Sequence, residues 1–277
     1  MSTTDFTQFP PIAFIGGGNM ASAIIGGLIR QGVPATRIIV VEPYEPQRAV
    51  LLQQFGIQAL PAADDSLSNA QVVVWAVKPQ TFKDAASSVA AFTAHALHLS
   101  VAAGIRSSSI AQWTANDAIV RAMPNTPALV GQGMTALFAR AGVTAAQQAL
   151  AEQIIGTTGQ FLWVQKEEQL DAVTALSGSG PAYVFYFLEA MQQAGVEMGL
   201  PAEQALQLAI GTFSGASQLA AQSSETPAVL RERVTSKGGT TFAALESMRA
   251  ANLGQHFISA MKAAEKRAVE LGDEFGK

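Results

Sequence analysis

The stretch Ile12-Ala-Phe-Ile-Gly16-Gly17-Gly18-Asn19-Met20-Ala21 decides the fold of this chain. The four apolar residues before the glycines predict a short buried strand, and the segment after them predicts a helix that runs to about Arg30. The spacing fits G-x-G-x-x-G/A, in which Gly16 permits a tight turn, Gly18 lets a pyrophosphate approach the backbone and Ala21 lets the helix pack closely on the strand. The free N–H groups at the start of such a helix favour bound phosphate. We therefore predict a dinucleotide site here, the alternative being a glycine-rich turn that binds nothing.

Two membrane-related interpretations of the N-terminal region are disfavoured by its residues. Residues 12–29 carry no charge and are long enough to cross a bilayer, but they contain five glycines and Asn19 where a helix would have to be continuous. A strand, a turn and a helix explain the same residues better. Residues 1–10 contain Asp5 and no positively charged start, so we expect no signal peptide.

The first half of the chain alternates apolar strands with helices. Continuous apolar strands separated by helices are typical of a parallel sheet with helices on both faces. We therefore predict an α/β fold, with a Rossmann-type doubly wound sheet over residues 1–160. Further strands are expected at 37–42, 72–77, 98–102, 118–122 and 134–138, and helices at 47–55 (ended by Gly56) and 82–93.

The second half, residues 161–277, is expected to be an all-helical dimerisation and substrate domain. Helical periodicity dominates from Leu170, and helices are predicted from Pro181 to about Gly199, from Pro201 to about Gln222, and over 240–250 and 252–271. The first of these helices is apolar nearly all round. Such a helix is buried in a large core or between subunits.

Composition limits the possible partners. Apolar residues make up 49% of the chain and charged residues only 14%, which predicts a sizeable interface between subunits. The net charge of −4, without a basic run, argues against nucleic acid. The absence of cysteine excludes disulfides and thiolate metal sites and is compatible with the cytoplasm, and His95, His98 and His256 lack metal-ligand spacing, so we expect no metal.

Several residues follow predicted strands at the edge where a ligand would bind. Glu42 ends the second strand, where a carboxylate favours NAD over NADP. Arg48 is close enough in sequence to bind the 2′-phosphate of NADP instead, and a further alternative is that Glu42 is only a solvated charge. Val77, Lys78 and Pro79 follow the third strand, the alternative being that Pro79 only starts the next helix and Lys78 is solvated. Residues 100–105 and the rigid loop 123–127 occupy similar places, and a purely structural loop stays open at 123–127.

Two clusters of small polar residues interrupt the helical half, at 175–183 and at 234–241. Each is expected to place hydroxyl and N–H groups at a helix N-terminus, which suits a carboxylate, the alternative being ordinary helix capping. No Ser/His/Asp set, zinc-protease motif or P-loop is present. Oxidation of an alcohol usually recruits a strong base, whereas an imine nitrogen accepts a proton from water or a hydroxyl. The residues therefore favour reduction of a C=N bond.

Six motifs together resemble the pyrroline-5-carboxylate reductase family, from about Ile12 to Leu271. They are Ile15–Met20, Val77–Gln80, Ala103–Ile105, Met123–Pro127, Ala175–Tyr183 and Thr235–Thr241. The resemblance implies that NADPH or NADH delivers hydride to 1-pyrroline-5-carboxylate, giving L-proline in the last step of proline biosynthesis. It also implies a homodimer with interlocked helical domains, which in relatives often assembles into a decamer.

The resemblance also assigns site residues. Ser236, Gly238, Gly239 and Thr241 would bind the substrate, with the Thr241 hydroxyl as the catalytic donor to the ring nitrogen. Lys237 stands where many relatives have proline, and Glu42 departs from the stretch found in NADP-preferring members. The residues expected to bind the dinucleotide are Gly16, Gly18, Asn19, Met20, Glu42, Val77, Lys78, Pro79, Ala103 and Asn125.

Two other functions stay open at this point. A two-domain hydroxyacid dehydrogenase would need a catalytic lysine in the helical half, for which Lys166 and Lys237 are available. A non-catalytic dinucleotide-sensing protein would keep the glycine turn but has no reason to keep two hydroxyl-rich clusters.

Overall fold

The computed structural model describes residues 8–276, and these fall into two compact units. The first comprises the described residues up to Ser179 together with those from Ala264 onward, and the second is Gly180–Ala263. The division thus lies at Ser179 and not at the expected residue 160, and the end of the last helix belongs with the first unit. Residues 1–7, which carry most of the signal-peptide prediction, lie outside the described residues.

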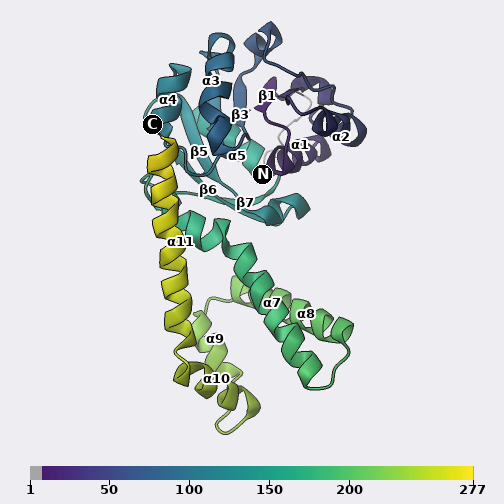
Figure 1. The fold of residues 1–277 in the computed structure, drawn as a ribbon, viewed down its shortest axis with the longest axis vertical. Coiled ribbons are helices and arrows are strands. Elements are labelled where there is room, and N and C mark those ends of the chain that lie inside the picture. Colours follow the sequence, from purple (N-terminus) through teal and green to yellow (C-terminus); the bar gives the residue numbers. More distant parts are fainter. Residues whose placement is uncertain (1–7, 277) are drawn as a thin grey trace. The chain divides into compact units, whose positions relative to one another are not determined.

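A seven-stranded sheet forms the centre of the first unit, with strand order β2-β1-β3-β4-β5-β6-β7 (Figure 1). β1 to β5 pair in parallel, whereas β6 runs antiparallel to β5 and parallel to β7. The doubly wound sheet is confirmed, but the expectation of a purely parallel sheet is wrong at this end. The strands are β1 (Ile12–Ile15), β2 (Ile38–Val41), β3 (Val72–Trp75), β4 (Leu97–Ser100), β5 (Ile119–Met123), β6 (Gly133–Ala139) and β7 (Gly159–Trp163).

Helices cover both faces of this sheet because its central strands are apolar on both sides. Phe14 and Val74 belong to a buried cluster that also holds apolar side chains of α1, α2 and α5. Ala13 and Trp75 belong to a second cluster, with side chains of α3 and α4. Alternate residues of one strand therefore serve opposite layers. These helices are α1 (Asn19–Arg30), α2 (Glu45–Phe55), α3 (Pro79–Thr93), α4 (Ser107–Thr114) and α5 (Ala145–Gly156).

Local chemistry explains where several helices begin and end. Gly56 follows α2 with φ of 68°, the left-handed conformation that glycine adopts most readily, so this predicted end is confirmed. α5 starts with a capping box in which Thr144 and Gln147 exchange side-chain and backbone hydrogen bonds. The sequence pattern did not lead us to expect α4, α5 or β7.

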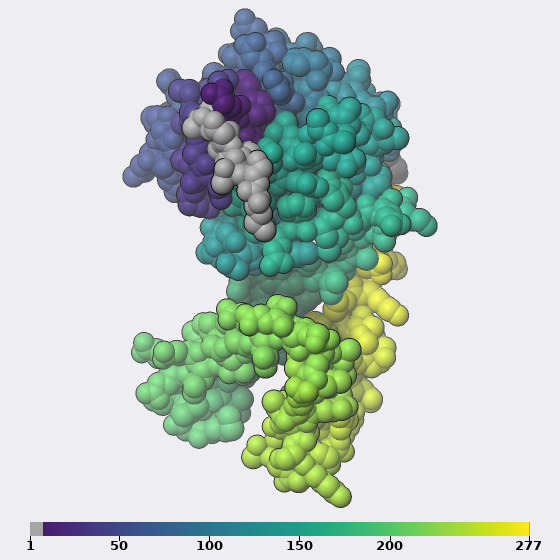
Figure 2. Space-filling view, turned by 180° about the vertical axis from the view of Figure 1, so that it is seen from behind, coloured from purple at the N-terminus to yellow at the C-terminus, as the bar shows by residue number. Residues whose placement is uncertain are grey.

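The second unit consists of helices and has almost no core of its own. α6 (Gln169–Val173) and a π-helical turn (Thr174–Gly178) lead from the first unit into α7. Among residues 180–263 only Gly195, Ala205 and Ala209 are buried. Figure 2 shows an open space between the green and yellow-green helices of this unit. Its helices are α7 (Gly180–Glu197), α8 (Ala202–Gln222), α9 (Pro227–Arg233), α10 (Thr240–Ala250) and the start of α11 (Leu253–Phe275).

The apolar α7 is not buried within the single chain. Phe185 is 59% exposed and Tyr186 is 69% exposed. The expectation that α7 is buried in the core of its own chain is therefore wrong, and the alternative, burial between subunits, stays a prediction. Among the described residues, no helix is long and apolar enough to cross a membrane.

Candidate functional site

The glycine turn between β1 and α1 has the geometry that the sequence predicts. Gly16 has φ of 92°, and a Cβ atom at this position would lie 2.6 Å from the carbonyl oxygen of Ala76. The Gly16 N–H donates to the carbonyl of Val41 at 2.8 Å, which fixes the turn against β2. Only glycine combines this conformation with this close approach of backbone.

The start of α1 fits a bound pyrophosphate. Gly18 precedes the helix in an extended conformation, and no side chain caps the first turn. A Cβ added to Gly18 would meet no described atom within 4 Å, so the backbone is open above this residue. Uncapped N–H groups at a helix N-terminus attract anions through hydrogen bonding and the helix dipole. The exposed Asn19 and the half-buried Met20 form the first residues of this turn.

Glu42 follows β2, and its carboxylate is held by the glycine turn through one oxygen and by the backbone after β2 through the other. Oε2 accepts from the Gly17 N–H and Oε1 from the Tyr44 N–H, each at 2.8 Å. The Gln47 amide donates to the carbonyl of Gly17 at 2.6 Å. We did not predict a role for Tyr44 or Gln47 from the sequence. Their place within five residues of Glu42, at the start of a helix facing the turn, is the signal that we did not use.

Arg48 lies beside Glu42, and its Nη1 donates to two backbone carbonyls, those of Glu42 at 3.1 Å and Pro43 at 2.7 Å. This side chain therefore stabilises the backbone after β2. Glu42 and Arg48 are thus neighbouring polar residues at the end of β2.

The parallel register brings the other predicted residues to the same edge of the sheet. Ile15 pairs with Val41 and with Trp75, and Trp75 pairs with Ser100, so these strands end level with one another. The residues that follow them therefore share one edge. They are Val77, Lys78 and Pro79 after β3 and Ala103 after β4.

The segment after β3 also fits the alternative in which Pro79 only starts the next helix and Lys78 is solvated. Pro79 is the first residue of α3, and Lys78 precedes it with an exposed side chain. The Lys78 carbonyl accepts from the Thr81 N–H at 3.1 Å. The Lys78 side chain is thus exposed at this edge, while Pro79 starts the helix.

Asn125 organises the loop after β5. Its Oδ1 accepts from the N–H of Met134 at 3.0 Å, and its Nδ2 donates to the carbonyl and hydroxyl of Ser177, each at 3.3 Å. The side chain thus ties the loop to β6 and to the π-helical turn. This is a structural role, and it also holds the amide at the ligand edge.

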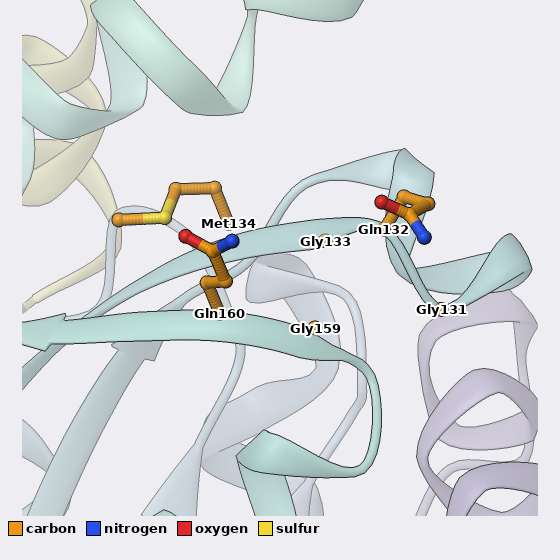
Figure 3. A pocket seen from close by; sticks show the side chains of 6 residues that line it. All are labelled: Gly131, Gln132, Gly133, Met134, Gly159 and Gln160. Atoms are coloured by element: carbon orange, nitrogen blue, oxygen red, sulfur yellow. The ribbon is translucent and has the colours of Figure 1, made fainter. Parts of the chain in front are cut away.

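A pocket of about 470 Å³ opens where β6 and β7 begin. Because these two strands run opposite to β5, their first residues lie at the edge where β1 to β5 end. Figure 3 shows Met134 and Gln160 on neighbouring strands, with Gln132 further along the rim. None of the residues that line this pocket is ionisable: Gly131, Gln132, Gly133, Met134, Gly159 and Gln160.

His98 is buried beneath this edge and belongs to the core. Its Nδ1 accepts from the indole N–H of Trp75 at 2.9 Å, and its Nε2 lies 3.2 Å from the Thr93 carbonyl, so Nε2 carries the proton of a neutral ring. Burial lowers the pKa of His98 to about 4, although the hydrogen bond to Thr93 opposes the shift. Of the two positions expected for His98, surface or core, the structure shows the core. Among residues 8–276 no group of three or more His, Asp or Glu side chains could hold a metal ion.

The two small-residue clusters of the helical half differ from one another. The cluster at 175–183 was expected at a helix N-terminus, and α7 does begin within it, at Gly180. Helical structure already precedes this start, because α6 and the π-helical turn lead up to it and the Ser179 N–H donates to the Thr174 carbonyl at 2.8 Å. Gly178 packs against the end of the Met123 side chain, which would have to move to make room for a Cβ at this position.

The second cluster also precedes a helix, within the second unit. α10 begins at Thr240 after Gly239, with no side-chain cap on its first turn. Gly238 has φ of 74°, and a Cβ on Gly239 would lie 2.6 Å from the hydroxyl oxygen of Ser236. Ser236 is exposed and Thr241 is half-buried in the first turn of α10. This loop therefore presents hydroxyls and backbone N–H groups together, as predicted.

Known proteins place these features in one family. A protein named pyrroline-5-carboxylate reductase from Pseudomonas aeruginosa is 44% identical over 97% of this chain and 99% of its own length. The chain belongs to the pyrroline-5-carboxylate reductase family. The reductase of the same name from Haemophilus influenzae is 42% identical over 95% of this chain and 98% of its own length.

Both halves match family models separately. Residues 167–271 match the model described as pyrroline-5-carboxylate reductase dimerisation, and residues 11–104 match the model described as NADP oxidoreductase, coenzyme F420-dependent. The solved pyrroline-5-carboxylate reductase from Coxiella burnetii superposes with a TM-score of 0.87 at 39% identity, covering 95% of this chain and 98% of that one. The Plasmodium falciparum structure, solved with NADP bound, shares the fold at 24% identity, with a TM-score of 0.85 over 96% of this chain and 99% of that one.

Proposed function

We propose that this chain reduces 1-pyrroline-5-carboxylate to L-proline with NADPH or NADH, the last step of proline biosynthesis. The main support is the match to reductases of this name over nearly the whole chain, together with an intact dinucleotide-binding turn. When bound, the reduced nicotinamide supplies a hydride to the carbon of the C=N bond, while a proton is added to the nitrogen. The carbon is thereby reduced and the dinucleotide oxidised.

The first unit provides the dinucleotide-binding half of the reaction. Gly16 and Gly18 keep the backbone open at the α1 N-terminus, where the amides of Asn19 and Met20 can hold phosphate oxygens. Glu42 is fixed at the end of β2, where a carboxylate accepts hydrogen bonds from a ribose. We assign the nicotinamide end to the residues after β3, β4 and β5, namely Val77, Lys78, Pro79, Ala103 and Asn125.

The second unit provides the groups proposed to bind the substrate. We assign the substrate carboxylate to the loop that holds Ser236, Gly238 and Gly239, since its uncapped amides and hydroxyl suit an anion. The hydroxyl of Thr241 is the proposed donor to the imine nitrogen. Catalysis then rests on positioning and electrostatic stabilisation, because the imine needs no strong base.

We further propose that the helical unit completes its core against a second copy, giving a homodimer that can assemble into a decamer. Support comes from the match of residues 167–271 to a dimerisation model and from the exposed aromatic side chains of α7. A unit with only three small buried residues gains its stability from an interface. The cytoplasm stays a prediction made from composition.

One spectrophotometric experiment tests the activity against both alternatives. The purified chain is mixed with pyrroline-5-carboxylate and NADH or NADPH, and separately with NAD⁺ or NADP⁺ and a series of β-hydroxyacids. We expect consumption of NADH or NADPH in the first mixture and no reduction of NAD⁺ or NADP⁺ in the second. Turnover of a hydroxyacid instead would establish the dehydrogenase, and dinucleotide binding without any turnover would establish the sensor.

A further inference from the structure

The segment between β4 and α4, residues 101–106, is held by groups from distant parts of the chain. It contains Ala103, which the proposed function places at the nicotinamide end, and buried Ala102 and Ile105. It begins after Ser100 and leads into Ser107, the first residue of α4. We name residues 101–106 the β4–α4 loop. Its own sequence, Val-Ala-Ala-Gly-Ile-Arg, provides one polar side chain, so its position depends on outside contacts.

Glu167 holds the far end of this loop. Its carboxylate accepts three hydrogen bonds, from the Ser107 N–H at 2.6 Å, the Ser107 hydroxyl at 2.6 Å and Arg121 Nη1 at 2.8 Å. α4 has no side-chain cap from its own preceding residue, Arg106. Glu167, sixty residues away in sequence, therefore caps α4 from outside.

The charges of this contact are nearly enclosed. The Arg121 side chain is 6% exposed and that of Glu167 18% exposed. Burial opposes ionisation of Glu167, but the hydrogen bonds from Ser107 and the charge of Arg121 bring its pKa below the ordinary value. Burial lowers the pKa of Arg121, and Glu167 opposes that shift. Removing one partner of such a pair leaves the other charge buried without compensation.

A second ion pair and the last helix hold the rest of the loop. Arg106 Nη1 lies 2.9 Å from the carboxylate of Asp171, which is 8% exposed. The Arg106 guanidinium lies against α11, where a Cβ on Gly272 would be 2.8 Å from its Nε. Gly104 faces the same helix, since a Cβ there would be 3.2 Å from Cβ of Leu271.

These contacts come from the two segments that connect the units. The chain leaves the first unit through Glu167, α6 with Asp171, and the π-helical turn, and it returns through α11. Both connections therefore contact the β4–α4 loop within the first unit. We propose that Glu167 and Asp171 are positioning residues that set this loop for the nicotinamide end of the dinucleotide, an inference that rests on the proposed function.

The test compares two ligands on the wild type and on Glu167→Gln by calorimetry. ADP-ribose contains the adenosine and pyrophosphate but no nicotinamide, so it depends on the glycine turn and Glu42 alone. NADH adds the nicotinamide end. We expect Glu167→Gln to bind ADP-ribose as the wild type does and to bind NADH less tightly. The kcat for pyrroline-5-carboxylate is expected to fall by about tenfold or more, since misplacement by about 1 Å can cost ~100-fold.

Glu152→Gln is the matched control. Glu152 lies on α5, is also partly buried and accepts a hydrogen bond from the indole of Trp163 at 2.6 Å. The same substitution there removes a charge from the same unit without touching the β4–α4 loop, and it is expected to leave both affinities unchanged. A general loss of stability would lower the affinities of both Glu variants for NADH and ADP-ribose to a similar extent.

The outcomes separate this inference from the proposed function. Equal effects of Glu167→Gln on NADH and ADP-ribose, or none on either, overturn the positioning role. If Glu167→Gln does not fold, Asp171→Asn is measured instead, with the same expected split and the same overturning result. A wild type that binds NADH but does not reduce pyrroline-5-carboxylate contradicts the proposed function, while the binding split still decides the role of Glu167. A wild type that binds neither NADH nor NADPH overturns both.

Discussion

Two alanine substitutions in the glycine turn are expected to have opposite consequences. Gly18 has an extended backbone with φ of −69°, and no described atom lies within 4 Å of an added Cβ. Gly18→Ala should therefore fold normally. Its methyl group, however, occupies the space through which a pyrophosphate reaches the backbone. Gly16→Ala has neither a permitted conformation nor room, because its φ is 92° and Ala76 is too close.

The structure sets the size of each effect. For Gly18→Ala the free energy of unfolding should stay the same or rise by up to about 1 kcal/mol, since alanine restricts the unfolded chain. Losing one charge-assisted hydrogen bond to phosphate costs about 1.5–3 kcal/mol, which weakens dinucleotide binding by about 10- to 100-fold. For Gly16→Ala the left-handed conformation alone costs about 1–2 kcal/mol, and the 2.6 Å contact with the Ala76 carbonyl adds to it.

Urea unfolding and calorimetric titration with ADP-ribose measure the two quantities separately. The expected result is a stable Gly18→Ala variant with weak binding and a destabilised Gly16→Ala variant. Wild-type affinity for ADP-ribose in a fully folded Gly18→Ala would refute the reasoning, because it would mean that the phosphate does not approach Gly18. Wild-type stability of Gly16→Ala would refute the packing argument.

Three further predictions concern stability, assembly and turnover. The pKa of His98 is about 4 in the folded chain and 6.5 in the unfolded chain, so its contribution to the free energy of unfolding is complete above pH 6.5 and falls by about 3 kcal/mol as the pH drops to 4. Urea unfolding at pH 6.5 and at pH 4 should therefore show a larger loss of unfolding free energy for the wild type than for His98→Gln. Phe185→Glu places a charge on the exposed apolar face of α7 and should dissociate the dimer, whereas Glu189→Gln, on an exposed position of the same helix, should not; light scattering reads the mass. Thr241→Ala should lower kcat while ADP-ribose binding is retained, and equal kcat in both proteins would remove Thr241 from the mechanism.

The sequence predicted best where one local signal fixes both conformation and contact. The strand Ile12–Ile15 and a helix ending at Arg30 were expected at these positions, and the structure confirms them. The strand after Arg37 and the end of α2 at Gly56 are also confirmed. In each case an apolar run or a glycine is enough to decide the local structure, so no distant partner had to be known.

The sequence predicted less where a distant contact decides the structure. Ser177 and Gly178 have the composition of a loop, yet they form the end of the π-helical turn, packed on Met123 and tied to Asn125. The antiparallel direction of β6 depends on its pairing with β5, which periodicity does not encode. The link from Glu167 to Ser107 joins two unremarkable segments across the fold.

In the proposed reaction, hydride passes directly from the dinucleotide to the carbon of an imine. The most direct measurement uses pyrroline-5-carboxylate with NADH or NADPH that carries deuterium at the transferable position, and locates the label in the product by NMR. We expect proline with one deuterium on the carbon that was double-bonded to nitrogen. Proline without deuterium, or no proline at all, would contradict this expectation.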